Sequence, residues 1–285
     1  ELTSYGWLRL MGRDRLDLLN RLSTNDLRKL AAGEGLPSVL TSPVGRVMAL
    51  MLVYVGAETV HVRLMPGQAQ GITRYLSSMI FFQDAVEVAD LSETTAQFAL
   101  YGPQSGDLLA RLSGLALDPV PEYGWRDGTL AGAVVSLHRG GPLEAWDWTV
   151  VTDLTQRQEV QAALSSGAGQ LTTETAELLR IKAGIPAWGR ELSDQVTPLE
   201  TGLLPAISFR KGCYTGQEVI ARQTNYDKVT RNLVGLVFDA APPGALGSGE
   251  TWPGRGPGRG GFVGSAAYSP DLDRMIALAV VPREL

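Results

Sequence analysis

The segment Phe209-Arg-Lys-Gly-Cys-Tyr-Thr-Gly-Gln-Glu-Val-Ile-Ala-Arg222 is chemically the most distinctive part of this chain. It holds the only cysteine, Cys213, which follows two adjacent cations, Arg210 and Lys211, and lies between two glycines. Thiolate is the reactive form of cysteine, and nearby positive charge favours it. If Gly216 starts a helix, the free N–H groups of the first turn add to this effect. The segment predicts a reactive thiol or an anion-binding loop; the alternative is a cysteine that only packs as a small buried hydrophobe.

Upstream of this segment, strand-like and helix-like stretches alternate. In the first hundred residues, the spacing of apolar side chains predicts strands at Gly6–Met11, Arg46–Val55 and Thr59–Leu64, and helices at Asp14–Leu22 and Gln68–Met79. The pattern starts again after Gly102-Pro103, with a hairpin of Leu130–His138 and Glu144–Thr152 and helices at Leu154–Leu164 and Thr173–Ala183. Such interleaving of strands and helices is typical of an α+β or α/β core.

The pattern changes near Val229, because helical spacing ends there and only strand-like stretches follow. We therefore expect the C-terminal part to be a small β module. The predicted organisation is an α+β module at residues 1–100, a second at 101–205, a connecting segment with the Cys213 loop at 206–229, and the β module at 230–285.

Composition excludes several classes of protein. The 285 residues carry a formal net charge of −5, and an acidic chain is a poor general binder of nucleic acid. One cysteine allows neither an intrachain disulfide nor a zinc site of several thiolates. The two histidines, His61 and His138, are too far apart in the sequence for an HExxH metal motif.

The sequence predicts neither a membrane span nor a secretion signal. The longest apolar stretch, Val47–Ala57, has about half of the roughly 20 residues that a membrane helix needs. The first residues show no basic segment followed by an apolar one, as a signal peptide would. We expect a cytoplasmic protein with no membrane partner and no direct nucleic-acid partner.

The octapeptide Lys211-Gly-Cys-Tyr-Thr-Gly-Gln-Glu218 resembles the signature of the YgfZ family, whose members are folate-binding relatives of the glycine-cleavage T-protein, an aminomethyltransferase. The resemblance covers most of the chain and is most specific at residues 177–222. Other similar stretches are Leu19–Asp26, Thr41–Arg46, Glu177–Pro186 and Pro198–Gly202. This resemblance implies a T-protein-like three-module ring, with two α+β modules and a C-terminal small β-barrel.

The resemblance also implies a function. Proteins of this family bind tetrahydrofolate and help to assemble or repair the iron–sulfur clusters of client enzymes, a tRNA-thiolating enzyme among them. The implied partners are a reduced folate and iron–sulfur client or assembly proteins. The candidate catalytic residues are those of the signature: Cys213, Lys211, Tyr214, Gly216, Gln217 and Glu218.

The candidate folate-binding residues are more scattered. Trp7 and Trp188 offer rings on which a pterin or p-aminobenzoate group can stack, and Trp7 matches an aromatic residue in some relatives. Asn25 and Asp26 supply polar edges, and the guanidinium of Arg222 suits the carboxylates of a glutamate tail. Each of these residues has an ordinary alternative role in packing, capping or surface charge.

Two departures from the aminomethyltransferase pattern affect the expected activity. Lys182, also a candidate folate contact, stands where those enzymes have a glutamate that holds the pterin. A carboxylate accepts hydrogen bonds from pterin N–H groups, whereas an ammonium only donates. The catalytic aspartate of the T-protein has no clear match either, because Met65–Gln70 fills that region. Both departures disfavour aminomethyl transfer.

The sequence therefore leaves three candidate functions. The first is a folate-binding accessory factor for iron–sulfur proteins, which uses Cys213. The second is a tetrahydrofolate-dependent aminomethyl transferase, and the third is a non-catalytic scaffold whose signature loop shapes a docking surface. One cysteine cannot hold a cluster alone, since clusters usually take four thiolates. The first function thus requires a partner that supplies further ligands.

Overall fold

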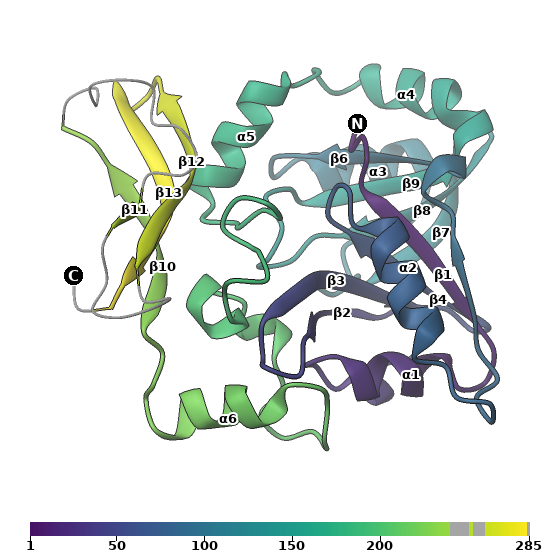
Figure 1. Ribbon diagram of the computed structural model, residues 1–285. Helices are drawn as coiled ribbons and strands as arrows, with labels where there is room; N and C mark the ends of the chain where they lie inside the picture. Colours follow the sequence, from purple (N-terminus) through teal and green to yellow (C-terminus); the bar gives the residue numbers. More distant parts are fainter. Residues whose placement is uncertain (240–250, 253–259, 284–285) are drawn as a thin grey trace. The chain divides into compact units, whose positions relative to one another are not determined.

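The computed structural model describes residues 1–239, 251–252 and 260–283 (Figure 1). Its strands form three sheets, and the chain divides into two compact units. The first unit comprises Glu1–Ser38 and Ala49–Gln170, and the second comprises Val39–Met48 and Leu171–Leu285. The first unit holds the second sheet and most of the first, and the expected module boundary at residue 100 falls inside this unit. Among the described residues, no helix has the length and apolar character that a membrane crossing requires.

The first sheet has the strand order β2-β3-β4-β1-β5. Its elements are β1 (Gly6–Met11), α1 (Arg15–Leu22), β2 (Gly35–Thr41), β3 (Val47–Val55), β4 (Thr59–Leu64), α2 (Ala69–Ser78) and β5 (Glu87–Asp90). The expected hairpin and both expected helices are confirmed. β3 is buried along nearly its whole length, which is why its sequence is an unbroken apolar run. The tip of the β2–β3 hairpin, from Val39 to Met48, belongs to the second unit.

The second sheet has the order β6-β9-β8-β7 and also lies in the first unit. Its elements are β6 (Thr95–Leu100), α3 (Ser105–Ser113), β7 (Trp125–Leu130), β8 (Ala133–Arg139), β9 (Trp148–Asp153) and α4 (Arg157–Ser165). The expected hairpin is confirmed as β8 and β9, but its first strand starts at Ala133 and not at Leu130. Ala131 and Gly132 both have positive φ angles and form a tight turn, so the chain reverses there and β7 pairs with β8.

A buried cluster of aromatic and histidine rings lies in the first unit. Trp7 stacks on His61 with 5.2 Å between ring centroids, and Trp125 stacks on His138 at 5.6 Å. Tyr54 contacts Trp7 and His138 edge-on or tilted. Burial, with a smaller effect of the nearby Arg9 charge, lowers the pKa of His61 to about 4. Burial also holds the pKa of His138 well below its usual range.

The second unit carries the C-terminal sheet, with the order β10-β13-β12-β11. Its elements are α5 (Thr173–Lys182), α6 (Gln217–Asn225), β10 (Arg231–Val237), β11 (Thr251–Trp252), β12 (Gly261–Ser269) and β13 (Arg274–Pro282). Ile181 of α5 packs against Ile276 and Leu278 of β13. Short 3₁₀ helices occur at Leu27–Lys29, Ser92–Thr94, Leu154–Gln156, Pro198–Thr201 and Leu204–Ala206. The described residues beyond 229 contain strands and no helix, as the sequence predicts.

Candidate functional site

Cys213 lies on a loop of the second unit, between the 3₁₀ helix Leu204–Ala206 and α6. Its side chain is exposed, so the interpretation of a small buried hydrophobe does not hold. Gly216 adopts φ of +81° and is the N-cap of α6, as the sequence suggested. A glycine suits this position because L side chains rarely adopt such an angle.

The two cations of this loop have different surroundings. Arg210 is exposed, whereas Lys211 is only 8% exposed and its Nζ lies 5.1 Å from the ring centroid of Tyr214. Tyr214 packs against Ile207 and Ile220, and burial raises its pKa to about 12. The structure thus places the Lys211 ammonium over a neutral phenol ring, in a cation–π contact.

The first turns of α6 carry three further candidate residues. Gln217 and Glu218 open the helix, and Glu218 accepts a hydrogen bond of 2.8 Å from the guanidinium of Arg222, one turn later. Both side chains of this pair are largely exposed. An exposed pair of this kind contributes little to stability, so Glu218 holds Arg222 only weakly.

Lys182 ends α5 and forms an ion pair with Asp271, which follows β12. Its hydrogen bond is the largest cause that lowers the pKa of Asp271 to about 2. The neighbouring Arg180 is buried and donates to Ser265 and Glu191. The Lys182 ammonium thus has a partner in the connection between β12 and β13. The other aromatic candidate of this unit, Trp188, is half-buried and forms an isolated bridge with Leu192.

The remaining folate candidates lie in the first unit. Trp7 is 4% exposed and its ring stacks on His61, so a pterin could stack on Trp7 only if such a contact opened. Asn25 is buried, with its side-chain amide donating to the Pro37 carbonyl at 2.8 Å. Asp26 pairs with Lys29 at 3.2 Å. All three side chains have structural roles in this conformation.

Comparison with known proteins places the chain in a family. Residues 1–211 match the family model described as the GCVT N-terminal domain. The chain belongs to the GCVT-domain family. A chloroplast protein of Arabidopsis thaliana that carries the name of a transferase is 31% identical over 274 residues, which cover 94% of this chain and 63% of that protein. This chain therefore spans less than two thirds of that relative's length.

Several relatives carry the name aminomethyltransferase. The aminomethyltransferase of Moorella thermoacetica is 28% identical over 296 residues, covering 99% of this chain and 77% of that protein. The crystal structure of the glycine cleavage system aminomethyltransferase T from Bartonella henselae matches with a TM-score of 0.81 at 20% identity, covering 99% of this chain and 77% of that one. This GCVT-domain chain thus has the α+β fold of the T-protein, as the sequence predicts.

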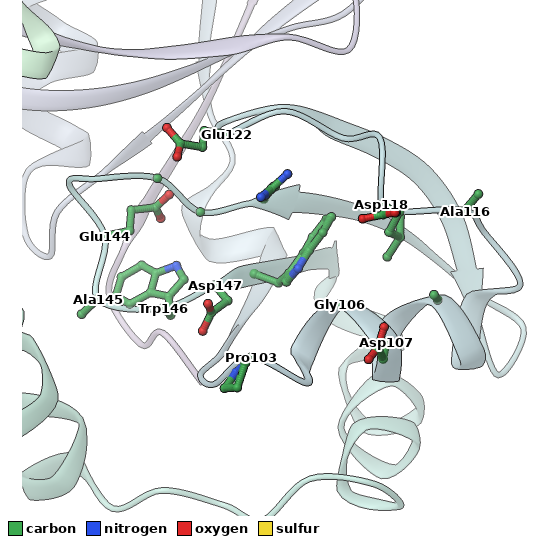
Figure 2. Close-up of a pocket in the computed structure, with 16 residues that line it drawn as sticks. Pro103, Gly106, Asp107, Ala116, Asp118, Glu122, Glu144, Ala145, Trp146 and Asp147 are labelled. Carbon is green, nitrogen blue, oxygen red and sulfur yellow. The ribbon is translucent and has the colours of Figure 1, made fainter.

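A cavity of about 750 Å³ lies in the first unit of the GCVT-domain chain (Figure 2). Its charged and aromatic lining residues are Asp107, Asp118, Glu122, Arg139, Glu144, Trp146, Asp147 and Trp148. Figure 2 shows Glu122, Glu144 and Asp147 along one side and Asp107 with Asp118 along the other. A folate tail carries carboxylates, so this excess of negative charge disfavours folate here. None of the residues singled out from the sequence lines this cavity.

Residues outside the set of candidate site residues form a buried ionic network in the second unit. Glu200 is buried and accepts hydrogen bonds from Arg231 at 2.9 and 3.0 Å. It also completes a capping box with Thr197, which the spacing Thr-x-x-Glu could have revealed. The guanidinium of Arg46 lies 3.6 Å from the same carboxylate. No group of three or more metal-ligating side chains suited to an ion occurs in the described part of the chain.

Proposed function

We propose that this GCVT-domain protein is a cytoplasmic, folate-binding accessory factor that helps to assemble or repair iron–sulfur clusters in client enzymes. The observation that carries the proposal is the exposed thiol of Cys213 within the octapeptide Lys211–Glu218. The proposed clients include an enzyme that thiolates tRNA. Iron and sulfur are cargo here, and Cys213 contributes one thiolate while a partner supplies the other ligands.

Folate binding is supported at the level of the family, whose named relatives include aminomethyltransferases. Tetrahydrofolate is the cofactor we propose. The residues of this chain fit such a ligand in part. The guanidinium of Arg222 is exposed and forms only a weak surface ion pair with Glu218. A guanidinium suits the carboxylates of a glutamate tail. The Lys182 ammonium is held by Asp271 and cannot accept hydrogen bonds from a pterin. We therefore propose that the folate is bound without the usual carboxylate clamp.

The second candidate is a tetrahydrofolate-dependent aminomethyl transferase. Its support is the similarity over nearly the whole chain to proteins named aminomethyltransferases. Lys182 and the lack of an aspartate in Met65–Gln70 weigh against it. The third candidate, a scaffold without chemistry, gives no reason for an exposed thiol at Cys213.

Calorimetric titration with tetrahydrofolate tests the ligand, using the wild type, Lys182→Glu and Lys182→Gln. We expect saturable binding by the wild type and binding roughly tenfold tighter by Lys182→Glu than by Lys182→Gln. The glutamate adds a charged hydrogen-bond acceptor, worth about 1.5–3 kcal/mol, and the glutamine serves as the matched control for loss of the ammonium. Lack of saturable binding by the folded wild type would refute the folate proposal. Equal affinities of the two variants would place position 182 away from the pterin.

A further inference from the structure

Two stretches that lie far apart in the sequence meet beside Cys213. The Oγ1 atom of Thr41, at the end of β2, donates a hydrogen bond of 2.6 Å to the carbonyl of Thr215, two residues beyond the thiol. Thr41 is fully buried. Both residues belong to the second unit, because that unit includes the hairpin tip from Val39 to Met48.

The backbones themselves are also in close contact. A Cβ atom added to Gly216 would lie 2.5 Å from the Ser42 carbonyl oxygen, and one added to Gly45 would lie 2.9 Å from Cβ of Val219. Real Cβ atoms essentially never approach other atoms so closely, so only glycine fits at either position. The turn from Ser42 to Arg46 therefore rests directly on the start of α6.

This turn is fixed on its other side. The Arg46 Nη1 atom donates to the Gln195 carbonyl at 2.9 Å, and the Val47 N–H donates to the Val196 carbonyl at 2.9 Å. Arg231 donates to the same Gln195 carbonyl at 2.7 Å, and it is paired with the buried Glu200. The turn thus connects a buried ionic network to the loop that carries the thiol.

We infer that Thr41 is a positioning residue of the Cys213 site. Its hydroxyl fixes the peptide at Thr215, and the turn behind it fixes Gly216, so the backbone on the C-terminal side of the thiol has one conformation. A site keeps its reactivity only when its supporting residues hold its geometry. The inference rests on the proposed function in one respect, namely that the Cys213 thiol is the reactive group.

The test is the rate of iodoacetamide alkylation of the native protein across pH 6–9, compared with a peptide of residues 209–222. We expect the wild type to react faster than the peptide and Thr41→Val to react roughly fivefold more slowly than the wild type, about the effect of one lost hydrogen bond. Thr41→Ser, which keeps the hydroxyl, should restore the wild-type rate and pH profile. Thr41→Ala replaces the valine variant if the latter does not fold.

Thr224→Val is the matched control, because it removes the same kind of hydroxyl-to-carbonyl hydrogen bond, here from Thr224 to Ile220 within α6. Its alkylation rate should equal that of the wild type. A fast wild-type thiol together with an equally fast Thr41→Val thiol would overturn the positioning role alone. A wild-type rate equal to that of the peptide would overturn both the reactive thiol and its support by Thr41.

Discussion

Replacing Cys213 with serine is expected to abolish the proposed support of client iron–sulfur enzymes in cells. The side chain is exposed, so the substitution removes no core packing and should leave the free energy of unfolding within about 0.5 kcal/mol of the wild type. Serine keeps the size of the side chain but has neither the nucleophilicity nor the metal affinity of a thiolate. The loss of client activity should therefore be nearly complete although the protein remains folded.

The measurement is client-enzyme activity in cells that carry the serine variant, alongside the melting temperature of the purified protein. Gly212→Ala is the matched control in the same loop, because a Cβ there meets no atom within 4 Å. That variant should support clients as the wild type does. Full client activity in cells with the Cys213→Ser protein would refute a chemical role of the thiol and favour the scaffold.

Acidification from pH 7.5 to 5 is expected to lower the free energy of unfolding by about 2 kcal/mol through His61 alone. The folded-state pKa of His61 is about 4, against 6.5 in the unfolded chain. The unfolded state therefore binds a proton more readily below pH 6.5, and stability falls as the pH drops from there towards 4. Full protonation amounts to about 3 kcal/mol. Burial also lowers the pKa of His138 well below its usual range, so this residue acts in the same direction.

Urea unfolding at pH 7.5, 6 and 5 measures this effect. The variant His61→Gln, which has no titrating group at that position, should lose less stability over the same interval than the wild type. The comparison separates the histidine from the carboxylates, since most carboxylates titrate below pH 5. Equal losses in the two proteins would show that His61 does not titrate differently in the folded and unfolded states.

The elements that the sequence predicted well depend on local signals. Helix α1 and the β3–β4 hairpin follow from the spacing of apolar residues that are close in the sequence. Helix α6 starts after Gly216, as the sequence predicted. The turn at Ala131–Gly132 was missed because the apolar pattern from Leu130 to His138 continues through it. A positive φ at a non-glycine residue such as Ala131 leaves little trace in a single sequence.

The supports of the site were harder to predict because they join distant positions. Arg46 contacts the Gln195 carbonyl across 149 residues, and Thr41 contacts Thr215 across 174. Local patterns contain no information on such pairs. The burial of Trp7 is a similar case. An aromatic residue at the start of a strand can bind a ligand by stacking or can pack in the core. Only the contacts of Trp7 with Tyr54, His61 and His138 show that it packs in the core.

The most direct measurement is the formation of methylenetetrahydrofolate by the purified protein, supplied with tetrahydrofolate and an aminomethyl-lipoyl donor protein, with a bacterial aminomethyltransferase as the positive control. A folate-binding accessory factor should bind the folate and yet form no product above the rate without protein. Neither Lys182 nor any residue of Met65–Gln70 carries the carboxylate that the resemblance to aminomethyltransferases leads us to expect at these places. Product formed at a rate proportional to protein concentration would contradict the accessory role and identify the protein as a one-carbon transferase.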